Sequence, residues 1–140
     1  IVVTTGIASI FLTKDCTPDY NSGLAHAVFY AMTAYPVIEE RHLHGEVVGF
    51  GVLLALLVDQ QEEAFEDIYR LNKAIHLPTS LEEIEITREQ WEECMTRIPH
   101  MSDVAHYPYP VTEDMLKSAM ERLEERNKKV LQTLSASCSL

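Results

Sequence analysis

Apolar residues recur with helical spacing along most of the chain, and this pattern predicts about six helices. The first covers residues 1–14, where β-branched residues leave a strand as the alternative. A second helix is expected to have Ser22 as its cap and to end before Pro36. After a polar connection, residues 45–59 are apolar on nearly every face, which indicates a central, buried helix.

Three more helices are predicted by amphipathic stripes in the second half of the chain. One ends at Pro78, the next begins at a capping box of Thr87 and Gln90, and the last is capped by Thr112. Residues 84–86 could form a short extended segment between the first two. The apolar stripes of these three helices are Ala64, Ile68, Leu71 and Ile75, then Trp91, Met95 and Ile98, then Leu116, Ala119, Met120, Leu123 and Val130.

The fold class predicted from these elements is all-α, a helical bundle that forms one domain over residues 1–134, with a tail at 135–140 that is expected to fray. Gly49 and Gly51 lie inside the central helix, where each glycine costs roughly 1 kcal/mol of helix propensity relative to alanine. We therefore expect another part of the chain to pack closely against the backbone at these two positions.

Composition and charge exclude several classes of function. The formal net charge of -11 argues against a nucleic-acid partner, because such binding depends on clustered Lys and Arg. The longest apolar run, residues 47–58, is too short to span a membrane. Three widely spaced cysteines without a CxxC pair indicate no disulfide framework, which is typical of a cytoplasmic protein. The chain begins without Met, so we expect it to be a piece of a longer protein.

His26 and His44 are the candidate metal ligands. His26 lies in the second predicted helix and His44 directly precedes the third, so a helical hairpin could bring both imidazoles to one end of the bundle. Zinc binds imidazole well, but a separation of 18 positions is no diagnostic motif. The residues alone favour a structural interpretation, in which His26 is a core histidine and His44 is a capping or surface histidine. His42 could replace His44, although its polar surroundings favour a solvated side chain.

No other recognisable constellation points to chemistry. The chain has neither a GxGxxG segment nor a P-loop, and it shows no convincing Ser, His and Asp arrangement. We therefore assign no catalytic and no cofactor-binding residue in this chain.

Two segments that contain the histidines resemble a known family. The segments SGLAHAVFYAMTAYP and HGEVVGFGVLLALL, in this order, are similar to the C-terminal helical domain of glycerol dehydrogenases, in the superfamily of metal-dependent alcohol dehydrogenases and dehydroquinate synthase. The resemblance is strongest over residues 20–60. It implies that His26 and His44 are metal ligands, with zinc as the expected metal. Some members carry a further histidine three positions after the first ligand, whereas Phe29 stands there in this chain, which favours the zinc-type branch.

The resemblance also implies a two-domain parent protein. In this family an N-terminal α/β domain binds NAD, and the substrate lies in the cleft beside the helical domain. The family's third metal ligand, an aspartate, has no counterpart in these 140 residues. We therefore expect the parent to be a homo-oligomer that oxidises glycerol or a similar small polyol or alcohol, and this chain alone to be inactive. Two alternatives stay open: a non-catalytic helical interaction module or remnant, and part of a related glycerol-phosphate dehydrogenase or dehydroquinate synthase-like enzyme.

Overall fold

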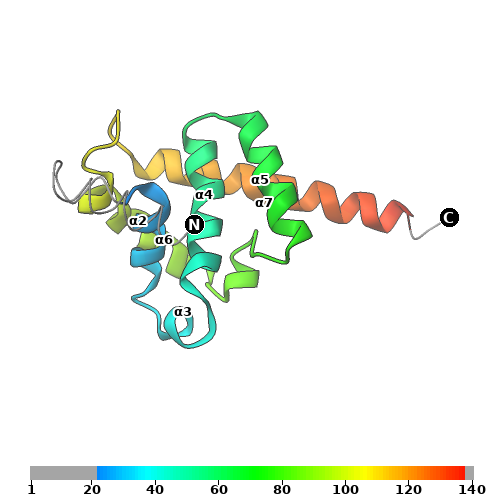
Figure 1. Cartoon of the computed structure of the whole chain (residues 1–140), viewed down its shortest axis with the longest axis horizontal. Coiled ribbons are helices and arrows are strands. Elements are labelled where there is room, and N and C mark those ends of the chain that lie inside the picture. The colour runs from blue at the N-terminus through cyan, green and yellow to red at the C-terminus, as the bar shows by residue number, and fades with distance from the viewer. Residues whose placement is uncertain (1–21, 138–140) are drawn as a thin grey trace, which may run out of the picture.

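The computed structural model describes residues 22–137, and within this range all regular secondary structure is helical (Figure 1). The helices in chain order are α2 (Leu24–Met32), α3 (Pro36–Arg41), α4 (His44–Val58), α5 (Glu62–Ala74), α6 (Arg88–Arg97) and α7 (Glu113–Ser137), with short 3₁₀ helices η2 (Glu82–Ile84), η3 (Ile98–His100) and η4 (Ser102–Val104). The predicted all-α class is confirmed. The predicted helix over residues 1–14 lies outside the described residues. The boundary between a domain at residues 1–134 and a tail at 135–140 stays a prediction.

The core is built around α4, as the apolar run at 45–59 predicted. This helix packs against α2, α5 and α7, and Figure 1 shows the long α7 crossing α4 and continuing past α5. The buried side of α4 consists of Val47, Phe50, Gly51, Leu53, Leu54, Leu57 and Val58. In the described part of the chain, no helix is both long enough and apolar enough to cross a membrane.

One of the two glycines in α4 lies directly against the backbone of α2. A Cβ placed on Gly51 would lie 2.5 Å from the carbonyl oxygen of Ala25 and 2.9 Å from its Cα, which only a backbone shift could relieve. At Gly49 a Cβ would meet the Leu77 side chain at 3.5 Å, an ordinary contact. The predicted close packing of backbones therefore holds at Gly51, whereas at Gly49 an alanine would fit.

Three local sequence predictions are wrong. Gly23 is the N-cap of α2, with no side-chain cap hydrogen bond, so Ser22 does not cap this helix. The polar connection contains α3, which begins at Pro36 because proline, lacking an N–H, is well suited to the first helical turn. Residues 84–86 are not extended: Ile84 ends η2, and Glu85 has a left-handed backbone with φ 59°.

The buried face of α5 also differs from the predicted stripe. Phe65, Tyr69 and Asn72 are buried, whereas Leu71 and Ile75 are 50% and 55% exposed. The Tyr69 hydroxyl donates to Asn127 Oδ1 at 2.7 Å, and Asn72 Nδ2 donates to the Gly49 carbonyl at 3.4 Å. Polar side chains that have hydrogen-bond partners can therefore be buried, and the spacing of apolar residues along a helix does not predict their burial.

The caps and faces predicted for the last two helices are confirmed. In α6 the amide of Gln90 donates to Thr87 Oγ1 at 3.2 Å, and the amide of Thr87 donates to Gln90 Oε1 at 2.9 Å. In α7 the amide of Met115 donates to Thr112 Oγ1 at 3.3 Å. Val130 is half-buried, and the other predicted positions of these two helices are buried: Trp91, Met95, Ile98, Leu116, Ala119, Met120 and Leu123.

Candidate functional site

Two histidines from different helices lie beside each other at the N-terminal end of α4. His26 is in the first turn of α2, and His44 is the first residue of α4. The connection between them contains α3 and returns the chain toward α2. Because Ala25 lies against Gly51 while Phe29 lies against His44, the two helices run in opposite directions. The ring of His26 is a neighbour of the ring of His44.

The two imidazole rings are close enough to share one ion. Their centroids are 5.6 Å apart and the ring planes are tilted by 43°. Rings whose nitrogens bind a single tetrahedral metal at about 2.0–2.1 Å have centroids roughly 5 Å apart. His26 is half-buried and His44 is exposed, so the pair lies at the surface, where a ligand can approach. The arrangement suits a shared metal, while the role of the two side chains stays a prediction.

The pair supplies only part of a metal site. Among residues 22–137, no group of three or more His, Cys, Asp or Glu side chains is placed to hold a metal ion. A zinc centre with an open position for substrate needs three protein ligands, and the two imidazoles supply two. In the described part of the chain neither ring forms a hydrogen bond, and both have aromatic rings as neighbours. The donor set therefore fits a metal incompletely.

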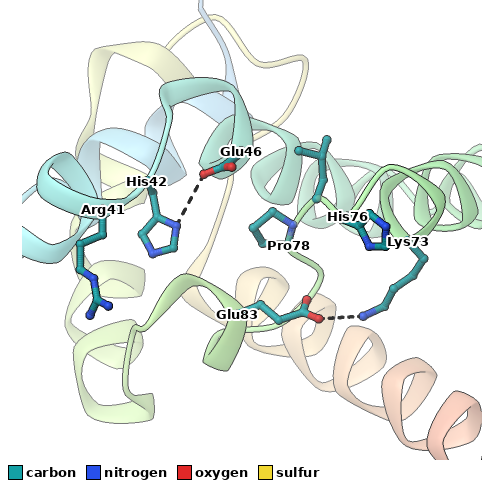
Figure 2. A pocket seen from close by; sticks show the side chains of 8 residues that line it. Arg41, His42, Glu46, Lys73, His76, Pro78 and Glu83 are labelled. Carbon is teal, nitrogen blue, oxygen red and sulfur yellow. Dashed lines mark hydrogen bonds and ion pairs between the residues drawn. The ribbon is translucent and has the colours of Figure 1, made fainter.

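A cleft of about 560 Å³ opens beside the turn that carries His44 (Figure 2). His42 lies in its wall with only 10% of its side chain exposed, so it is not the solvated residue predicted from the sequence. Its Nδ1 is 3.7 Å from Glu46 Oε2, and its Nε2 is 3.4 Å from Glu85 Oε2. His42 thus faces two carboxylates, and within residues 22–137 its ring has no contact with the ring of His26 or His44.

The charged groups around this cleft pair with one another. Arg41 Nη1 is 2.6 Å from Glu85 Oε1, and Lys73 Nζ is 3.0 Å from Glu83 Oε1, as Figure 2 shows for the lysine pair. Glu46 accepts a hydrogen bond from the amide of Leu43 at 2.9 Å. The Arg41 pair joins the end of α3 to the segment after η2, the Lys73 pair joins α5 to η2, and the Glu46 hydrogen bond is local to the start of α4.

The remaining histidines do not join the pair. His76 follows α5 with a left-handed backbone, φ 59°, and is exposed. His100 ends η3, and His106 lies in the segment before α7. None of the three has a ring contact with His26 or His44 in the described part of the chain.

A second polar cluster, which was not predicted from the sequence, lies at the C-terminal end of α4. Asp59 follows the last residue of this helix and accepts hydrogen bonds from the hydroxyls of Tyr107 and Tyr109, the first at 3.3 Å. Burial and the neighbouring Asp59 raise the pKa of Tyr107 to about 12 and also raise that of Tyr109. These partners are about 50 positions apart in the chain, so no local pattern could reveal them.

Comparisons with known proteins agree with the family resemblance of the two histidine segments. No protein-family model matches the chain. It is 29% identical over 104 residues to hydroxycarboxylate dehydrogenase A of Escherichia coli, covering 71% of this chain and 28% of that protein. It is 35% identical over 95 residues to a glycerol dehydrogenase of Thermotoga maritima, covering 63% and 25%, and 35% identical over 86 residues to one of Pseudomonas putida, covering 60% and 22%.

The chain is related to these dehydrogenases. The resemblance to glycerol dehydrogenases predicted from the sequence is thereby confirmed. The chain spans about a quarter of the length of the curated relatives it matches. The activity of a complete protein therefore does not transfer directly to these 140 residues.

Proposed function

We propose that the chain is the metal-binding helical part of an NAD-dependent dehydrogenase that oxidises glycerol or a similar small polyol or alcohol. The observation that supports this most strongly is the approach of His26 to His44, with ring centroids 5.6 Å apart. The relation to glycerol dehydrogenases gives this pair a chemical context, because two of the matched proteins carry that name.

In this proposal His26 and His44 hold a divalent metal through imidazole nitrogens, and zinc is the expected ion. When bound, such a metal polarises the hydroxyl of the substrate and lowers its pKa. The two side chains fix the position of that hydroxyl relative to α2 and α4. The nicotinamide that accepts the hydride belongs to a separate nucleotide-binding domain.

The 140-residue chain alone is expected to be inactive. Two protein ligands hold zinc less tightly than three, and the chain has no recognisable site for the nucleotide. A third ligand and the nucleotide-binding domain are therefore expected from the parent protein. We also propose that the parent is a homo-oligomer, as the family resemblance suggests.

Assays of the parent protein test this function. With NAD and a small polyol, we expect reduction of the nucleotide, and loss of that activity in both His26→Ala and His44→Ala. The matched control is His100→Ala, which removes an exposed histidine at the end of η3 and is expected to leave the rate unchanged. Full activity in both histidine variants would overturn the ligand assignment. A parent without dehydrogenase activity that assembles through this chain would favour the interaction module instead.

A further inference from the structure

The orientation of His44 is not set in the way that is usual for a metal ligand. A metal-binding imidazole normally donates its second N–H to a carboxylate or carbonyl, which fixes the ring. His44 is exposed and has no hydrogen-bond partner among the residues that the structure describes. The nearby Glu46 carboxylate is engaged elsewhere, because it accepts from the amide of Leu43 and faces His42.

The ring of Phe29, and not a hydrogen-bond acceptor, contacts the imidazole of His44. Its centroid is 4.4 Å from the centroid of His44, and the planes meet at 79°, an edge-to-face arrangement. Phe29 itself is partly buried and packs against the hydrophobic core, so its ring is a fixed support. Because Phe29 stands three positions after His26 in α2, the two side chains lie on the same face of the helix and both meet His44.

We propose that Phe29 is the positioning residue that orients His44 for metal binding. This inference rests on the proposed function of the histidine pair. Edge-to-face contact restricts the rotation of the imidazole about its side-chain bonds, so that less freedom is lost when the nitrogen binds an ion.

The test is Zn²⁺ affinity of the 140-residue chain, followed through the NMR signals of the two histidine rings. We expect Phe29→Leu to weaken binding roughly three- to tenfold, the range that an aromatic pair of this kind contributes. Phe29→Tyr keeps the ring and is expected to restore binding. The matched control is Phe65→Leu, the same substitution in α5, because the Phe65 ring contacts Tyr69 and neither histidine of the pair within residues 22–137.

A readout without metal separates a positioning role from a purely structural one. In the metal-free chain we expect proton cross-relaxation between the Phe29 and His44 rings, and greater mobility of the His44 ring in Phe29→Leu at unchanged helical content. If the wild type binds Zn²⁺ through both histidines but Phe29→Leu binds equally well, the inference fails and the proposed function stands. If the wild type shows no Zn²⁺ binding at the pair, the inference fails, and the proposed function is decided separately by the activity of His26→Ala and His44→Ala in the parent protein.

Discussion

Gly51 of α4 lies directly against the backbone of Ala25 in α2, so that a Cβ at Gly51 would come within 2.5 Å of the Ala25 carbonyl oxygen. His26 follows Ala25 in the chain, and α4 also carries His44 at its first position. This contact between the two helices is therefore one residue away from one of the two candidate ligands. We therefore expect a change in the spacing of α2 and α4 at this contact to change the separation of the histidine pair.

Gly51→Ala is expected to destabilise the fold and to separate the two histidines. A methyl group at this site forces the helices apart, which costs roughly 1–3 kcal/mol and exceeds the gain in helix propensity of roughly 1 kcal/mol. Thermal or denaturant unfolding measures the loss, and the NMR signals of His26 and His44 report the change in their contact.

Gly49→Ala is the matched control, because it adds the same methyl group two positions earlier in the same helix. There the added Cβ meets the Leu77 side chain at 3.5 Å, so the alanine fits and the propensity gain remains. We expect equal or higher stability and unchanged histidine signals. Equal effects of the two substitutions would contradict the role of Gly51 in spacing the helices.

The cluster of Asp59 with Tyr107 and Tyr109 predicts a loss of stability at high pH. In the folded chain the pKa of Tyr107 is raised to about 12 from its ordinary value of 10.0. The native state thus retains a proton that the unfolded state releases, and stability falls as pH rises from about 10 to about 12. Denaturant unfolding across this range measures the slope.

Tyr107→Phe tests the cause of this slope, because it removes the titrating hydroxyl and keeps the ring. We expect the variant to lose less stability than the wild type between pH 10 and pH 12, although Tyr109 still contributes. An identical alkaline slope in the variant would show that other groups are responsible.

The ion pair of Glu66 with Arg126 joins α5 to α7 and predicts an acid-dependent contribution. Arg126 Nε is 2.6 Å from Glu66 Oε1, Arg126 Nη2 is 3.0 Å from Glu66 Oε2, and these hydrogen bonds lower the pKa of Glu66. The contribution of this ion pair to the free energy of unfolding is therefore complete above the ordinary glutamate pKa. It is lost as pH falls through the lowered pKa of Glu66. Arg126→Gln is expected to cost roughly 0.5–1 kcal/mol at neutral pH.

The difference between wild type and Arg126→Gln should shrink as the solution is acidified through the titration of Glu66, which unfolding curves at several pH values would reveal. Arg70→Gln is the comparison, since Arg70 is 68% exposed and its contacts to Glu66 and Asp67 are 3.9 Å long. We expect it to change stability less. A pH-independent deficit in Arg126→Gln would instead point to lost packing of the guanidinium over the Tyr69 ring, which lies 4.7 Å away.

The sequence predicted the elements of the fold better than it predicted their orientation. The central α4, the capping box of Thr87 and Gln90, and the cap at Thr112 are local features, and each is present. The buried face of α5 was missed because Tyr69 is drawn inward by a hydrogen bond to α7, a partner far away in the chain. Such pairings are fixed by the packed structure, and helical periodicity contains no information about them.

The candidate site shows the same limit. The residues alone left His26 and His44 as a doubtful pair, and a family resemblance was needed to favour them. The connection between them contains α3, and α2 and α4 pack closely at Gly51 and Ala25, and the spacing of the histidines in the sequence reveals neither feature. The support of His44 by Phe29 is likewise a contact between two helices, so only the structure identified it.

A Zn²⁺ titration of the 140-residue chain that follows the ring signals of all its histidines tests the shared metal site most directly. We expect the signals of His26 and His44 to shift together at one Zn²⁺ concentration. We also expect His26→Ala to remove the shift of His44, and His44→Ala to remove the shift of His26. His100, which is exposed and outside the pair, serves as the internal reference. Independent shifts of His26 and His44, or a response no stronger than that of His100, would contradict a shared metal centre.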